Sequence, residues 1–152
     1  MSWLRSCFLR MALVCIALTS CSSLFSKGQP SPVYDVRSAV VLAGPNMPAP
    51  LLAGVGDRVN AAINATVRTN VYPRVILTIR ILSAEKGQGY NGRQYIAKVT
   101  VDAASVEDGS VIAVSSFSVT SLSNNKAAAD EILAEDIAGR IRSIFSLNAG
   151  HA

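Results

Sequence analysis

The sequence has very few of the side chains that build metal and thiol sites. It contains one histidine, His151, and three cysteines, Cys7, Cys15 and Cys21, among 152 residues. Everything after Cys21 therefore lacks the thiols and paired imidazoles of the usual zinc and redox sites, and it cannot form an internal disulfide. A domain built from this part of the chain must be held together by its hydrophobic core alone.

Patterns typical of nucleic-acid binding and of catalysis are also missing. Arg5 and Arg10 are 2 of the 14 basic residues, so a chain without residues 1–20 keeps 12 basic against 10 acidic side chains. This balance is too even for a nucleic-acid footprint. Ser115 and Ser116 have no candidate base nearby, and the carboxylates of the C-terminal region are expected to pair with arginines on a solvated helix face. We therefore expect no enzyme activity, no metal site and no non-covalent cofactor.

The N-terminal segment has the three parts of a bacterial export signal. Arg5 and Arg10 supply a positive start, residues 11–18 form a short apolar run, and Thr19 and Ser20 are small. The run is too short for a membrane span of roughly 20 residues. The stretch Leu18-Thr19-Ser20-Cys21 resembles the lipobox of bacterial lipoprotein precursors. This resemblance implies cleavage between Ser20 and Cys21, and diacylglycerol and N-acyl chains on Cys21.

Two other interpretations of this segment remain open, namely an ordinary cleaved signal with a chance cysteine and an uncleaved anchor. Residues 21–32 are rich in Ser, Gly and Pro, which is typical of a flexible tether between a lipidated cysteine and a domain. Ser22 follows the cysteine directly. This resembles the pattern that sends lipoproteins to the outer membrane in enteric bacteria, with the inner membrane as the alternative.

Residues 33–148 are expected to form one domain, followed by a disordered tail at 149–152. Alternating apolar residues predict strands at 33–43, 74–84, 93–103 and 111–120, and the polar, Gly-rich residues 85–92 predict a long loop. The side chains expected to point inward from the strands are Tyr34, Val36, Val40, Leu42, Val75, Leu77, Ile79, Ile81, Tyr95, Ala97, Val99, Val101, Val111, Ala113, Phe117 and Val119.

Helical spacing appears twice. Residues 50–70 carry one apolar side, and Gly54 and Gly56 suggest a start nearer Asp57 because glycine weakens a helix. A second helix follows the candidate N-caps at 123–125 and has Gly150 as its candidate stop. The expected apolar side chains are Leu52, Val55, Val59, Ile63, Thr66 or Val67 in the first helix, and Ala129, Ile132, Leu133, Ala134, Ile137, Ala138, Ile141, Ile144 and Phe145 in the second.

The order strand, helix, three strands, helix predicts an α+β two-layer sandwich. Its four-stranded mixed sheet would carry both helices on one face. The other face is expected to mix polar and aliphatic residues. It is either a plain solvated surface or a docking surface for a partner, for which the candidate residues are Arg80, Ile96, Lys98, Ile112 and Val114.

This architecture behind a lipidated cysteine is similar to small envelope-accessory lipoproteins such as the lipopolysaccharide-assembly lipoprotein LptE. The resemblance implies a lipid-anchored envelope protein that contacts an envelope protein partner and serves as an assembly or transport accessory. A periplasm-facing binder of a lipid or another apolar ligand is the alternative, and it would need a cavity between the helices and the sheet.

Overall fold

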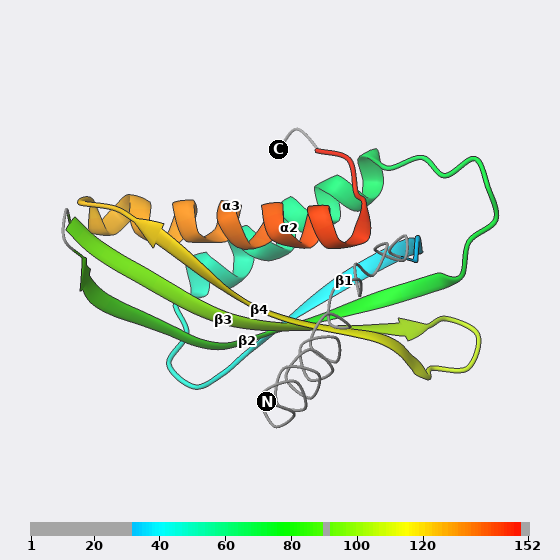
Figure 1. The fold of residues 1–152 in the computed structure, drawn as a ribbon, viewed down its shortest axis with the longest axis horizontal. Helices are drawn as coiled ribbons and strands as arrows, with labels where there is room; N and C mark the ends of the chain where they lie inside the picture. The colour runs from blue at the N-terminus through cyan, green and yellow to red at the C-terminus, as the bar shows by residue number, and fades with distance from the viewer. Residues whose placement is uncertain (1–31, 90–91, 150–152) are drawn as a thin grey trace, which may run out of the picture. The chain divides into compact units, whose positions relative to one another are not determined.

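The fold is that of a two-layer α+β domain. The computed structural model describes residues 32–89 and 92–149. Four strands form one mixed sheet in the order β1-β2-β3-β4, and helices α2 and α3 cover one of its faces (Figure 1). Strand β1 is parallel to β2, and the pairs β2–β3 and β3–β4 are antiparallel. The predicted fold class and element order are thus confirmed.

Strand β1 spans Asp35–Ala43 and differs from its prediction in which side chains face inward. Its register against β2 shifts between Val36 and Ser38, which marks a β-bulge. Because one extra residue reverses the alternation, the expected inward positions Val40 and Leu42 are 51% and 45% exposed. Their neighbours Ala39 and Val41 pack against the core instead.

Strands β2 and β3 are longer than predicted. They span Arg74–Gly89 and Gly92–Ser105, and their pairing continues to Gly89 opposite Gly92. The prediction of a loop at residues 85–92 is therefore wrong, because cross-strand pairing outweighs the low strand propensity of the glycines. The inward faces are confirmed, since all eight predicted side chains are at most 3% exposed. A second register shift, between Ile81 and Ser83, places Leu82 in a bulge.

Strand β4 spans Val111–Leu122 and forms an edge of the sheet. Ala113, Phe117 and Val119 pack against the core, as expected. The expectation for Val111 is wrong, because a register shift opposite Ala103 and Ala104 leaves this side chain 57% exposed.

Helix α2 spans Ala49–Ala65, so it begins well before Asp57. Pro50 lies in its first turn, where proline needs no hydrogen-bond partner for its nitrogen. The apolar side is centred on Leu51, Val55, Val59 and Ile63, and Leu52 is only partly buried. The helix ends at Ala65, so Val67 lies beyond it and is 81% exposed.

Helix α3 spans Lys126–Phe145. The next residue, Ser146, has a left-handed φ of 52° and terminates the helix. The Leu147 N–H then donates to the Arg142 carbonyl at 2.9 Å, as in a Schellman motif. The expected stop, Gly150, lies outside the described residues. The predicted apolar stripe is buried or packed against the core, with one exception: Ile132 is 39% exposed.

The core lies between the helices and the sheet. One continuous cluster joins the inward faces of the strands to both helices, and side chains such as Ile79, Ile137 and Val59 are fully buried. Each such side chain contributes roughly 1.5–3 kcal/mol of transfer free energy. Both described helices lie on one face of the sheet, so no element of residues 32–89 and 92–149 covers the opposite face, which we call the open face.

Candidate functional site

The open face carries the residues that the sequence nominated for docking. Strand pairing aligns Arg80 with Thr100 and Ser116, and it aligns Lys98 with Ser83 and Ser118. Thr100 and Ser116 connect neighbouring strands through their hydroxyl oxygens, which lie 3.2 Å apart. The centre of the open face is thus polar, and it consists of one cation from β2, one cation from β3 and a row of hydroxyl groups.

The guanidinium group of Arg80 already forms an ion pair within the protein. Its Nη1 donates to Oδ2 of Asp102 at 2.5 Å, and the Asp102 side chain is only 12% exposed. Such a pair is costly to break, because separating it would leave a largely buried carboxylate without its partner. Arg80 therefore serves first to neutralise Asp102, a role that the sequence pattern did not reveal.

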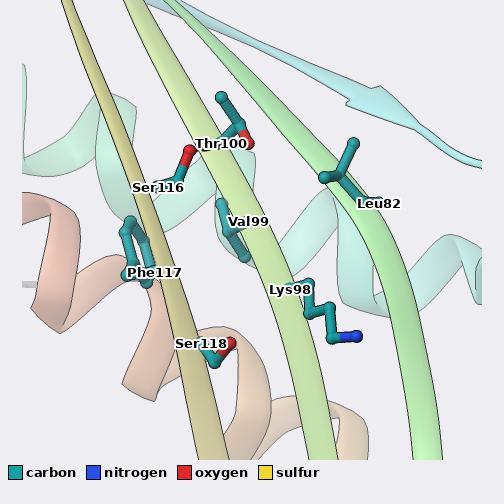
Figure 2. Close-up of a pocket in the computed structure, with 7 residues that line it drawn as sticks. All are labelled: Leu82, Lys98, Val99, Thr100, Ser116, Phe117 and Ser118. Carbon is teal, nitrogen blue, oxygen red and sulfur yellow. Dashed lines mark hydrogen bonds between the residues drawn. The ribbon is translucent and has the colours of Figure 1, made fainter.

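Lys98 differs from Arg80 because it is exposed and none of the contacts within the described residues pairs its ammonium group. It stands beside Leu82, the bulged residue of β2, which is 55% exposed. These two residues border a shallow pocket of about 290 Å³ on the open face (Figure 2). The pocket is also lined by Val99, Thr100, Ser116, Phe117 and Ser118.

The chemistry of this pocket suits binding. On the open face, Leu82 supplies aliphatic carbon, Lys98 supplies an ammonium group, and the other lining residues supply three hydroxyl groups, while the side chains of Val99 and Phe117 belong to the core. An apolar side chain with a neighbouring carboxylate would match that combination, because the carboxylate would meet the free charge of Lys98. Within the described residues, no group of three or more His, Cys, Asp or Glu side chains could hold a metal ion.

The remaining candidate residues do not form one patch with Arg80 and Lys98. Ile96 pairs with Thr120, whereas Ile112 lies in the bulge opposite Ala103 and Ala104. A separation of seven residues along β3 corresponds to about 23 Å. Ile96 is half-buried, while Ile112 and Val114 are 42% and 64% exposed. The structure therefore separates the aliphatic residues into two groups, one at each side of the polar centre.

Three exposed aliphatic residues of the open face were missed by the sequence pattern. Val40 and Leu42 on β1 and Val111 on β4 were expected to face the core. The outward orientation of each follows from a register shift in its strand pairing. No local feature of the sequence marks these bulges, since they depend on the neighbouring strand.

The carboxylates of α3 lie on the helical layer, where they join the two helices. Arg58 on α2 bonds to Glu131 at 3.3 Å and to Glu135 at 2.9 Å, and Arg142 bonds to Glu135 at 2.6 Å. The hydrogen bond from Arg142, together with its charge and with Arg58, lowers the pKa of Glu135. Asp136 instead accepts a hydrogen bond from Ser121 on β4.

Residues 107–109 form the turn between β3 and β4. Asp108 accepts hydrogen bonds from the N–H and the hydroxyl group of Ser110, which lower the pKa of its carboxyl group. Gly109 adopts a φ of 73°. The described turn residues are fully accounted for by turn chemistry.

Several predicted residues lie outside the described part of the chain. These are Ser20 and Cys21 at the expected cleavage and lipidation site, and His151 in the expected tail. Among the described helices, none is long and apolar enough to cross a membrane.

No family model matches the sequence, and no curated protein matches it. The expected likeness to LptE therefore has no counterpart at the level of sequence. Several solved structures resemble the chain at low similarity. A proposed lipoprotein from Caulobacter crescentus is similar with 14% identity and a TM-score of 0.49, over 74% of this chain and 88% of that one.

Two further similar structures have comparable values. A Xanthomonas campestris protein of family DUF330 has 16% identity and a TM-score of 0.47, over 74% of this chain and 79% of its own. The PelC dodecamer from Paraburkholderia phytofirmans has 17% identity and a TM-score of 0.45, over 75% and 87%. All three likenesses have TM-scores below 0.5, and they assign no role to this chain.

Proposed function

We propose that the protein is a lipid-anchored lipoprotein of the bacterial envelope that works by binding a protein partner on its open face and catalyses no reaction. Cys21 carries the lipid, and the outer membrane is the expected location. The partner would be an envelope protein, for which this domain is an assembly or transport accessory. The observation that carries the proposal is the sheet face that no described helix covers, where Leu82 and Lys98, whose ammonium group is unpaired among the described residues, border a shallow pocket.

Two physical arguments support binding at this surface. First, the open face exposes aliphatic side chains beside polar groups, and contact with a partner would remove these aliphatic side chains from water. Second, the space between helices and sheet is occupied by the protein's own side chains, such as the fully buried Leu51, Leu77 and Ile141. The protein therefore presents its binding capacity on the outside of the sheet.

The anchor is tested by labelling cells with a clickable fatty acid. Wild-type protein should take up the label and sediment with membranes, and Cys21→Ser should do neither. Label that persists in Cys21→Ser would show that the anchor assignment is wrong.

The docking surface is tested by placing a photo-crosslinking amino acid at position 82 in intact cells. A matched position is Ile132, which is also an exposed aliphatic residue but belongs to the helical layer. We expect a discrete adduct from position 82 that weakens when Lys98 is changed to Glu, and none from position 132. Adducts of equal yield and pattern from both positions would contradict a specific open-face partner.

A further inference from the structure

One end of the domain gathers three segments that are distant in sequence. The Asp35 N–H donates to the Pro73 carbonyl at 3.0 Å, which places the start of β1 beside the connection 66–73 between α2 and β2. The Val106 N–H donates to the Arg74 carbonyl at 3.0 Å, which adds the β3–β4 turn. In Figure 1 these segments lie at the right-hand end of the sheet, opposite the β2–β3 hairpin. We refer to this end as the entry end, because the chain enters the domain here.

The entry end exposes aliphatic side chains to solvent. Val71 and Val67 are 103% and 81% exposed, and Val106 is 42% exposed. These three are the exposed large hydrophobic residues of the described chain that lie outside its helices and strands, and all three are at the entry end. Val111 on β4, 57% exposed, extends the same surface. The grouping is thus spatial, although the residues come from two separate connections.

The charges at the entry end balance. The basic side chains are Arg37, Arg68 and Arg74, and the acidic ones are Asp35, Glu107 and Asp108. Arg37 pairs with Asp35 at 2.7 Å. Arg68 donates to the carbonyl groups of Phe145 and Ser146. A neutral, apolar surface of this kind does not depend on anionic lipids or on an acidic partner, because it offers no net charge to attract them.

The position of the anchor decides what can meet this surface. Eleven residues separate Cys21 from Val33, and eleven residues span at most about 36 Å even when fully extended. A short connection keeps the entry end at a high effective concentration next to the bilayer, so a weak contact that would fail in free solution suffices. Resting on the proposed lipid anchor, we infer that the entry end contacts the lipid interface, with Val67, Val71 and Val106 in the region between headgroups and acyl chains.

This contact would orient the domain. The strands of the sheet start or end at the entry end, so the β2–β3 hairpin would lie farthest from the bilayer. The open face would then stand roughly perpendicular to the membrane surface. A partner in the envelope could reach this face without displacing the domain from the bilayer.

The test uses tryptophan as a depth reporter. The only tryptophan of the sequence, Trp3, lies in the segment expected to be removed, so a single new tryptophan reports alone in the processed protein. Val71→Trp and Val106→Trp report on the entry end. Leu122→Trp is the matched control, because Leu122 is an aliphatic residue, 62% exposed, at the far end of β4. The lipidated proteins are placed in phosphatidylcholine vesicles with and without brominated acyl chains.

We expect brominated lipid to quench the fluorescence of Val71→Trp and Val106→Trp at least about twofold, and to leave Leu122→Trp unchanged. The quenching should be the same at low and high salt because the surface is neutral. Equal quenching of all three proteins, or none, with Cys21 shown by mass spectrometry to be acylated, would overturn this inference alone. Absence of acylation on Cys21 would overturn the anchor and, with it, the membrane contact.

Discussion

The side chain of Asn60 closes the free edge of the sheet, and removing it should weaken the domain measurably. The amide group accepts a hydrogen bond from the Ala39 N–H at 3.2 Å and donates to the Ala39 carbonyl at 3.3 Å. It also donates to the Gly56 carbonyl at 2.9 Å. Ala39 lies on β1, the edge strand that pairs only with β2. Asn60 thus takes the place that a further strand would occupy on the outer edge of β1.

We expect Asn60→Ala to lower the free energy of unfolding by about 2 kcal/mol. Each lost hydrogen bond costs about 0.5–1.5 kcal/mol, and partly buried backbone groups left unpaired cost about 1–3 kcal/mol. Alanine has a higher helix propensity than asparagine, so the substitution also stabilises the helix by a few tenths of a kcal/mol, which offsets a small part of the loss. With an m-value of about 2 kcal/mol/M, the urea midpoint should fall by roughly 1 M.

Asn64→Ala is the matched control, because Asn64 belongs to the same helix but is exposed to solvent. Asn64→Ala gains the same stabilisation from the higher helix propensity of alanine, and it loses no contact with β1. Equal urea midpoints for the two variants would refute the reasoning that Asn60 completes the edge of β1. Light scattering gives a second measurement, since an uncapped edge strand should also promote association of Asn60→Ala.

Two further predictions concern the glycines and the charges between the helices. A Cβ at Gly44 would lie 2.8 Å from the Leu82 carbonyl oxygen, whereas at Gly56 its nearest contact would be a Val41 methyl group at 3.6 Å. Gly44→Ala should therefore lower stability by about 1–3 kcal/mol and Gly56→Ala should raise it by up to about 1 kcal/mol in urea unfolding; the same sign for both would contradict this. Because the pKa of Glu135 is lowered from its ordinary value of 4.5, its ionised form stabilises the fold above that pH, and the contribution is lost as the pH falls. Glu135→Gln should thus be less stable than wild type at pH 7, with a difference that shrinks towards pH 3, and a difference that does not change with pH would argue against this pairing.

The periodicity of the sequence was sufficient for the element order and for the central strands. Val75 to Ile81 and Tyr95 to Val101 alternate without interruption, and their inward side chains are buried as expected. These strands are paired on both sides, so their register is fixed by two neighbours. Local pattern and tertiary pairing agree there.

Prediction failed at the edge strands and at the hairpin, because pairing between strands overrides local preference. A bulge after Val36 turned Val40 and Leu42 outward, and another left Val111 exposed. Residues 85–89 have the composition of a loop, yet they continue β2 because β3 supplies partners for them. Register depends on residues far away in the chain, so a window of a few residues does not contain it.

The candidate surface divides in the same way. That Arg80 and Lys98 face away from the helices followed from alternation alone. Their different roles did not, since Arg80 is occupied by Asp102, 22 residues away, while Lys98 stays unpaired at a pocket formed beside a bulge. An ion pair between residues this far apart in the sequence cannot be predicted from a local pattern.

The sequence by itself determined the order of strands and helices and the inward faces of β2 and β3. These are properties of short stretches, in which spacing and residue type act directly. Only the tertiary structure decided which aliphatic residues stay exposed, that Asn60 closes the edge of β1, and that the segments of Val67, Val71 and Val106 lie at the end where the chain enters the domain. The physical reason is that these features arise from the pairing and packing of distant segments, which no local pattern encodes.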